Sequence, residues 1–236
     1  MHRKSWGKLP SPLNLFGVAA VVLVLGGIEQ AKAGTVVLTF EGCGDSAQIL
    51  NFYNGGTDSA GNSGPNYGIS FSSNSLCSIS QLAGGSGNFQ GNPSGVGTAF
   101  FLNGTADTMN VAAGFTTGFS FYYSSAQAGS INVWSGQNDT GTLLTTLSLG
   151  ANNQNHCAPG STQTFCSWDP IGVTFTGTAE SVDFAGVANE VGFDNITLGA
   201  SVPAPEPSTA LLLSAGIVTL VARRRHRQDA SHGYRA

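Results

Sequence analysis

The central part of the chain lacks positively charged side chains. All nine lysines and arginines of the 236-residue sequence lie in residues 1–32 or 223–235, and residues 34–200 contain none. The same stretch holds ten aspartates and glutamates, so its formal charge is zero minus ten, or −10, whereas that of the whole chain is −4. Nucleic-acid binding depends on phosphate neutralisation by lysine and arginine, and anionic lipid attracts basic segments. The composition therefore excludes nucleic acid and anionic membrane surfaces as partners of this stretch.

Residues 34–200 also contain little that indicates catalysis. His156 is their single histidine, and no serine lies within a G-x-S-x-G sequence. Glycoside hydrolysis needs two cooperating carboxylates, but no spacing singles out two of the ten. We therefore expect that the protein is not an enzyme, with a glycan-active enzyme as the least favoured alternative.

Long hydrophobic runs are missing from the middle of the chain and occur at its two ends. At the N-terminus, a basic segment with Arg3, Lys4 and Lys8 precedes an apolar run over 13–25, and Ala31-Lys32-Ala33 follows. This order is typical of a signal peptide with an A-x-A cleavage site. We expect residues 1–33 to be a signal helix that signal peptidase removes, so that the remaining chain is exported.

The C-terminal run lies between a proline-rich segment and a basic cluster. Residues 208–222 carry no charge over 15 positions, fewer than the roughly 20 that a full membrane span needs. The arginines after this run favour a cytoplasmic C-terminus. Residues 201–236 are thus expected to form a proline-rich handle, a short transmembrane helix over 208–222 and a basic tail in the inner membrane, with residues 34–200 outside the cytoplasm.

The tail contains a sorting motif, Pro205, Glu206, Pro207 and Ser208, before the apolar run, and a basic stop, Arg223, Arg224, Arg225 and Arg227, after it. In these residues it resembles the PEP-CTERM sorting signal of exported bacterial proteins. The resemblance implies a transient membrane anchor that an exosortase, a membrane-embedded cysteine transpeptidase, cuts near Pro-Glu-Pro. It further implies transfer to the cell envelope or extracellular matrix, and association with exopolysaccharide or biofilm. The alternative is an ordinary single-span anchor with a proline-rich stalk.

The pattern of residues 34–200 is that of short strands. In 118–123, Phe119, Phe121 and Tyr123 fall on one face and Ser120 and Tyr122 on the other. Similar runs recur between segments rich in glycine, serine and asparagine, without a helical stripe. We expect an all-β domain, an antiparallel, jelly-roll-like β-sandwich. The expected strands are 35–41, 49–53, 67–71, 98–102, 109–113, 118–123, 131–134, 143–147, 172–176, 181–184 and 191–198.

The resemblance extends in pieces into this domain. The segments 51–57 and 66–71 look like a recurring PEP-CTERM ectodomain, and 192–198 is similar to the last strand of galactose-binding-like jelly rolls and carbohydrate-binding modules. The resemblance implies a structural calcium between the first and last strands, with Glu41 and Asp194 at the matching positions. The alternative is that both carboxylates are merely solvated.

Four cysteines in an exported chain predict two disulfides. Of the three possible pairings we favour Cys43–Cys77 and Cys157–Cys166. A zinc site that includes His156 is the alternative, but the cysteines lack the C-x₂₋₄-C spacing of such sites.

Exposed aromatic rings would suit sugar binding. Trp134 and Tyr122 are the residues we assign to it, because alternation places Trp134 away from Ile131 and Val133, and Trp168 and Tyr67 are further candidates. The alternative is that all four are core or sheet-face residues, the more common role of aromatic residues in such strands. The sequence thus predicts a non-catalytic, exosortase-processed matrix protein, with a calcium-stiffened carbohydrate-binding module as the alternative.

Overall fold

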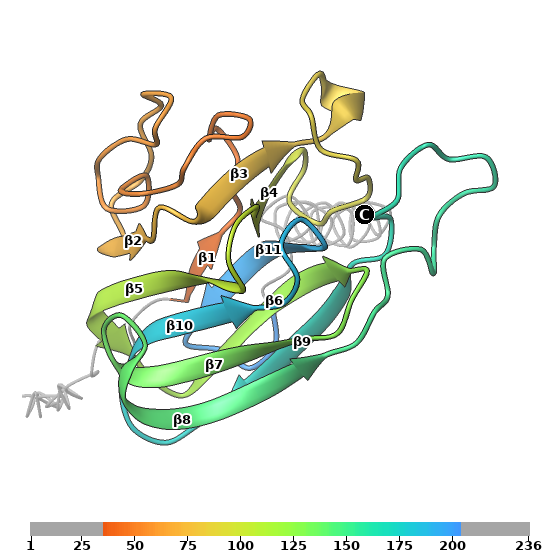
Figure 1. The fold of residues 1–236 in the computed structure, drawn as a ribbon. Coiled ribbons are helices and arrows are strands. Elements are labelled where there is room, and N and C mark those ends of the chain that lie inside the picture. The colour runs from red at the N-terminus through yellow and green to blue at the C-terminus, as the bar shows by residue number, and fades with distance from the viewer. Residues whose placement is uncertain (1–34, 204–236) are drawn as a thin grey trace, which may run out of the picture. The chain divides into compact units, whose positions relative to one another are not determined.

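The computed structural model describes residues 35–203. The predicted signal peptide and the helix predicted over 208–222 lie outside the described residues. The described part contains one short 3-10 helix, η1 (Gln81–Ala83), and otherwise strands and loops (Figure 1). The strands are β1 (Val36–Leu38), β2 (Ile69–Phe71), β3 (Ser75–Ile79), β4 (Gly97–Phe101), β5 (Ala106–Phe115), β6 (Gly118–Ser125), β7 (Gly129–Gly136), β8 (Thr140–Leu149), β9 (Asp169–Thr174), β10 (Ala179–Ala185) and β11 (Val191–Leu198).

The strands form two antiparallel sheets. One has the order β3-β4-β11-β6-β9, with β1 also paired to β11, and the other has the order β2-β5-β10-β7-β8. Every strand pairing is antiparallel. The predicted all-β sandwich is therefore confirmed for this part of the chain. Within residues 35–203, no helix has the length and apolarity to cross a membrane.

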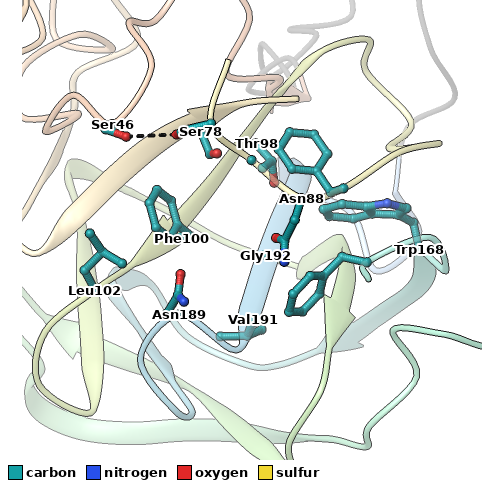
Figure 2. Close-up of a pocket in the computed structure, with 14 residues that line it drawn as sticks. Ser46, Ser78, Asn88, Thr98, Phe100, Leu102, Trp168, Asn189, Val191 and Gly192 are labelled. Atoms are coloured by element: carbon teal, nitrogen blue, oxygen red, sulfur yellow. Dashed lines mark hydrogen bonds between the residues drawn. The ribbon is translucent and has the colours of Figure 1, made fainter. Parts of the chain in front are cut away.

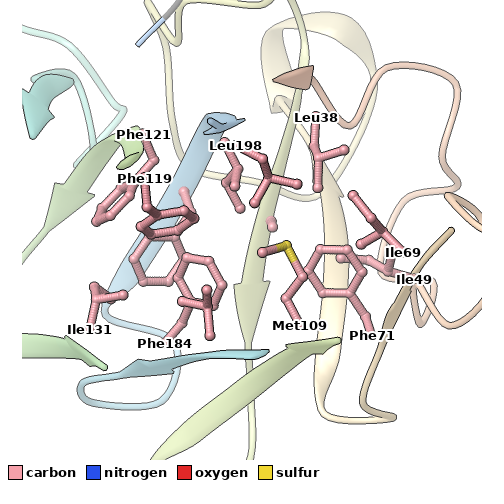
Figure 3. Packing of buried hydrophobic residues seen from close by; sticks show 14 of the residues in the cluster. Leu38, Ile49, Ile69, Phe71, Met109, Phe119, Phe121, Ile131, Phe184 and Leu198 are labelled. Carbon is pink, nitrogen blue, oxygen red and sulfur yellow. The ribbon is translucent and has the colours of Figure 1, made fainter. Parts of the chain in front are cut away.

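The core lies between the two sheets and is rich in phenylalanine. Phe119 and Phe121 of β6 are fully buried, as the alternating pattern predicts, and their rings meet Phe184 of β10 edge-on (Figure 3). The ring centroids of Phe184 and Phe193 lie 4.8 Å apart. Aromatic pairs in such tilted and edge-on arrangements add to the stability that burial of their area provides.

Two local predictions differ from the structure. Residues 49–53 form turns instead of a strand, because Leu50 has a φ of 46° and the Phe52 N–H bonds to the Ile49 carbonyl. Ile49 and Phe52 are nevertheless buried. Conversely, Ser75–Ile79 forms strand β3, which was not predicted because serines interrupt its apolar pattern.

Both favoured disulfides are confirmed. Cys43 is bonded to Cys77 and Cys157 to Cys166, and the described residues contain no free cysteine. The first disulfide lies within the hydrophobic core. Because the core and both disulfides fall within residues 35–203, this segment has what it needs to fold by itself.

Candidate functional site

The outer face of the sheet that contains β11 carries a pocket of about 180 Å³ (Figure 2). Its floor is formed by Ser78 of β3, Thr98 and Phe100 of β4, and Gly192 of β11. These positions alternate with core residues such as Ala99 and therefore face away from the core. The Thr98 hydroxyl donates to the Phe193 carbonyl over 2.7 Å, which keeps this part of the floor fixed.

Two loops that are distant in sequence form the wall of the pocket. Residues 86–89 precede β4 and residues 165–168 precede β9. The side-chain amide of Asn88 donates to the Thr164 hydroxyl over 2.6 Å, and the backbones at Phe89 and Phe165 form a parallel bridge. The wall therefore exists only when the two loops meet.

Trp168 is held in the wall by a hydrogen bond and a ring contact. Its indole N–H donates to the Gln90 carbonyl over 3.1 Å, and its ring meets that of Phe89 edge-on at 5.9 Å. A Cβ atom on Gly192 would lie 3.1 Å from the Trp168 ring. Glycine at this position thus lets the half-buried indole approach the sheet.

The two disulfides flank the pocket. Cys77 directly precedes Ser78 of the floor, and Cys166 lies between Phe165 and Trp168 of the wall. Each disulfide therefore restrains one part of the site, which favours a preformed pocket over one that forms on binding.

The lining combines aromatic and aliphatic surface with neutral polar groups. None of its residues carries a charge. Leu102 and Asn189 lie at the exposed edge, and within the described residues the Asn189 side chain has no hydrogen-bond partner. Such a surface suits a ligand with an apolar ring face and hydroxyl groups. The residues that line it are Ser46, Ser78, Ser86, Gly87, Asn88, Phe89, Thr98, Phe100, Leu102, Phe165, Trp168, Asn189, Val191 and Gly192.

The two aromatic residues assigned to sugar binding lie elsewhere. Trp134 is on β7 in the other sheet, next to the fully buried Val133, and its indole nitrogen is buried without a hydrogen-bond partner. Tyr122 lies on β6, opposite Pro170 and Asp194 in the strand register, and does not line the pocket. The assignment of sugar binding to Trp134 and Tyr122 stays an untested prediction, and the pocket uses other aromatic residues.

Asp194 is a fully buried carboxylate that anchors the loop before β4. The Ser94 hydroxyl and the Asn195 N–H donate to its Oδ1 over 2.7 Å each. The Ser94 N–H and the Asn92 amide donate to its Oδ2 over 2.9 and 3.2 Å. Burial raises the pKa of Asp194 to about 7, although these donors act in the opposite direction.

Glu41 holds the same loop from the other side. Its Oε1 accepts the N–H groups of Val96 and Gly97 over 2.9 and 2.7 Å. The Ser94 hydroxyl also lies 2.8 Å from the Thr39 carbonyl, so it is placed between Asp194 and the segment that leads to Glu41. Glu41 and Asp194 thus both accept hydrogen bonds from the same loop, residues 92–97.

These donors do not fit a calcium site between Glu41 and Asp194. Calcium takes six to eight oxygen ligands, whereas N–H groups occupy positions around both carboxylates. In residues 35–203, no three acidic, histidine or cysteine side chains cluster in a way that would hold a metal ion.

We expect calcium to leave the thermal stability of the domain unchanged. Millimolar Ca²⁺ or a chelator should move the Tm by less than about 1 °C, whereas a cation bound at 100 times its Kd would raise it by about 5–10 °C. Ser94→Ala should lower the free energy of unfolding by about 2 kcal/mol, since it removes a hydroxyl that donates to a carboxylate. Scanning calorimetry measures both effects, and a calcium-dependent rise of several degrees would contradict the hydrogen-bonded account.

The remaining residues singled out in the sequence are the sorting motif, the basic stop and His156. The sorting motif 205–208 and the basic stop 223–227 lie outside the described residues. His156 does lie inside them, where its Nδ1 is 3.0 Å from the Ser167 hydroxyl and its neighbour Cys157 is in a disulfide.

Comparison with known proteins gives distant structural matches. No family model matches the chain, and no curated protein is similar to it in sequence. A solved family 6 carbohydrate-binding module, studied by binding sub-site dissection, is 23% identical, with a TM-score of 0.35 over 56% of this chain and 87% of its own. The module CsCBM6-3 from Clostridium stercorarium, solved with cellobiose, is 22% identical, with a TM-score of 0.32 over 48% of this chain and 80% of its own.

A third solved structure is a glycoside hydrolase family 43 arabinoxylan arabinofuranohydrolase from Bacillus subtilis, in complex with cellotetraose. It is 19% identical, with a TM-score of 0.35 over 61% of this chain and 30% of its own.

Proposed function

We propose that residues 35–203 form a non-catalytic domain that binds neutral carbohydrate in the pocket on the β3-β4-β11 face. The observation that carries this proposal is the lining itself, where Trp168, Phe100 and Phe165 lie among hydroxyl and amide side chains without any charge. Sugars present apolar C–H faces that stack on aromatic rings and hydroxyls that pair with neutral donors and acceptors.

The charge of the domain favours an uncharged glycan. Residues 34–200 carry ten acidic and no basic side chains, so a uronic acid or sulfated sugar would be repelled and would find no arginine or lysine to pair with. The pocket volume of about 180 Å³ is below the roughly 300 Å³ of typical ligand sites. It fits one sugar unit or the end of a chain.

We further propose that the protein is exported, sorted by an exosortase and retained in the cell envelope or matrix. The order of signal segment, proline-rich handle, apolar run and basic cluster supports this. An extracellular polysaccharide would then be available as the ligand. Mass spectrometry of both ends of the mature protein tests the sorting step, and an intact tail in cells that have an exosortase would contradict it.

Replacing Trp168 should remove carbohydrate binding. Trp168→Ala takes away the ring that the Gln90 carbonyl and Phe89 hold in place, and we expect the affinity to fall at least about tenfold. Affinity electrophoresis in gels that contain neutral or uronate polysaccharides measures this loss and the preference for neutral chains.

Trp134→Ala is the matched control, since it removes the same side chain from the other sheet. Its affinity should equal that of the wild type, with circular dichroism showing that both variants are folded. Loss of binding in Trp134→Ala alone would place the site on the other sheet, and retarded migration by uronate chains only would contradict the proposed ligand class.

A further inference from the structure

Strand β8 forms a free edge of the five-stranded sheet. It pairs with β7 and with no other strand. Within residues 35–203, no backbone hydrogen bond links β8 to any other segment. One row of its N–H and C=O groups therefore points away from the sheet. Figure 1 shows β8 at the edge of the sheet, next to β7.

The edge strands β2, β9 and β3 have features that discourage pairing with another chain, whereas β8 is long and has neither charge nor proline. Strand β2 is three residues long, β9 begins with Asp169 and Pro170, and β3 is bonded to the loop before it through the Cys77 N–H and the Ala47 carbonyl. Short length, charge, proline and a covering loop are the usual protections of an edge. Strand β8 has ten residues with neither charge nor proline.

The part of β8 away from its turn is also regular. The register shifts of the β7–β8 pair lie between Val133 and Gly136, on the turn side, whereas the pairs from Gly129–Leu149 to Val133–Thr145 follow one another without interruption. A bulge therefore disturbs pairing only near the turn, and residues 145–149 offer a flat edge.

The distribution of charge identifies the partner that this edge fits. Two copies of a domain with ten acidic and no basic residues repel each other over most of their surface. Residues 140–168 contain no charged side chain, so β8 is where copies approach with least repulsion. An identical strand also matches β8 in length and neutrality, as a two-fold symmetric interface requires.

We propose that two copies of the domain associate through antiparallel pairing of their β8 strands. The five-stranded sheet of each copy then continues into that of the other through the regular residues 145–149. Because each copy uses the same strand, the assembly closes as a dimer and does not extend into a fibre. The pocket lies on the other sheet, so the dimer presents two binding sites.

Sedimentation velocity of residues 34–203 at increasing concentration tests this proposal. The wild-type domain should shift from monomer to dimer between about 1 and 100 µM. A variant with Thr146→Glu and Ser148→Glu, both at exposed positions of the regular segment 145–149, should stay monomeric over the same range, because the added negative charges repel each other across the pair.

The matched control carries Ala112→Glu and Ala113→Glu on β5, exposed positions on a strand that lies between two others in the sheet. It adds the same charge and should dimerise as the wild type does. A wild-type domain that stays monomeric up to about 100 µM, or a dimer that the β8 variant forms equally well, would overturn the proposal. Circular dichroism and thermal melts establish that each variant is folded.

Discussion

Removal of the Cys43–Cys77 disulfide is expected to lower the free energy of unfolding by about 4 kcal/mol. The bond closes a loop with a sequence separation of 34, and in the chain-entropy model such a cross-link destabilises the unfolded state by this amount. Both sulfurs also lie in the core, so the double variant Cys43→Ala and Cys77→Ala loses packing as well. Urea denaturation followed by tryptophan fluorescence measures the loss.

The second disulfide provides the control. Cys157→Ala with Cys166→Ala opens a loop with a sequence separation of only 9 and should cost about 3 kcal/mol. Because Cys166 lies between Phe165 and Trp168, this variant should weaken carbohydrate binding even where it remains folded. Equal stability of wild-type and Cys43/Cys77 variant domains would contradict the role given to the first bond.

The second large effect concerns Asp107, which is expected to make the domain less stable as the pH rises. Burial, with a smaller contribution from the nearby charges of Asp183 and Asp139, raises the pKa of Asp107 to about 8, although a hydrogen bond from Ser75 acts in the opposite direction. One oxygen of the carboxyl group is buried without a hydrogen-bond partner. A protonated Asp107 thus suits its surroundings better than a charged one.

The direction of the pH effect follows from this raised pKa. Between the ordinary pKa near 4 and about 8 the folded state binds more protons than the unfolded state, so stability is fully present below pH 4 and falls as the pH rises through 8. Asp107→Asn should remove this loss and raise the Tm at pH 9 by about 10 °C, with little change at pH 4. Thermal melts from pH 4 to 9 measure the difference between the two proteins.

Asp194→Asn is the informative comparison, because burial also raises the pKa of that group. Its oxygens accept four hydrogen bonds from Asn92, Ser94 and Asn195, and an amide would turn a donor toward some of them. This variant should be less stable than the wild type at every pH. If Asp107→Asn instead destabilises the domain at pH 9, the unpartnered carboxylate is not the source of the pH dependence.

Features that depend on local pattern could be predicted from the sequence. The alternation of apolar and polar residues in 118–123 predicted strand β6 and the burial of Phe119 and Phe121. Four cysteines in a chain with an export signal predicted the two disulfides. Strand β3 was not predicted, because Ser75 and Ser78 are buried in the structure and a serine does not indicate a buried strand position. The turns at 49–53 were not predicted, because this segment is as rich in apolar residues as a strand.

The pocket could not be predicted, because its wall depends on long-range contacts. The Asn88–Thr164 hydrogen bond joins residues 76 apart in sequence, and neither segment has a pattern that points to the other. Trp168 was recognised as a possible sugar-binding ring, but Phe89, Phe100 and Phe165 were not, since rings near strands are usually core residues. The contacts of the Ser94 hydroxyl with Asp194 and Thr39 likewise join residues that are distant in sequence, so no local pattern predicts them.

The central claim, that the β3-β4-β11 face binds neutral carbohydrate, is tested most directly by hydrogen exchange with and without a neutral polysaccharide that retards the protein. The account predicts slower exchange on binding in residues 86–89 and 165–168, which form the wall of the pocket. It predicts no change in residues 129–149 of the other sheet, where Trp134 lies. Protection confined to 129–149, with the pocket wall unaffected, would contradict it.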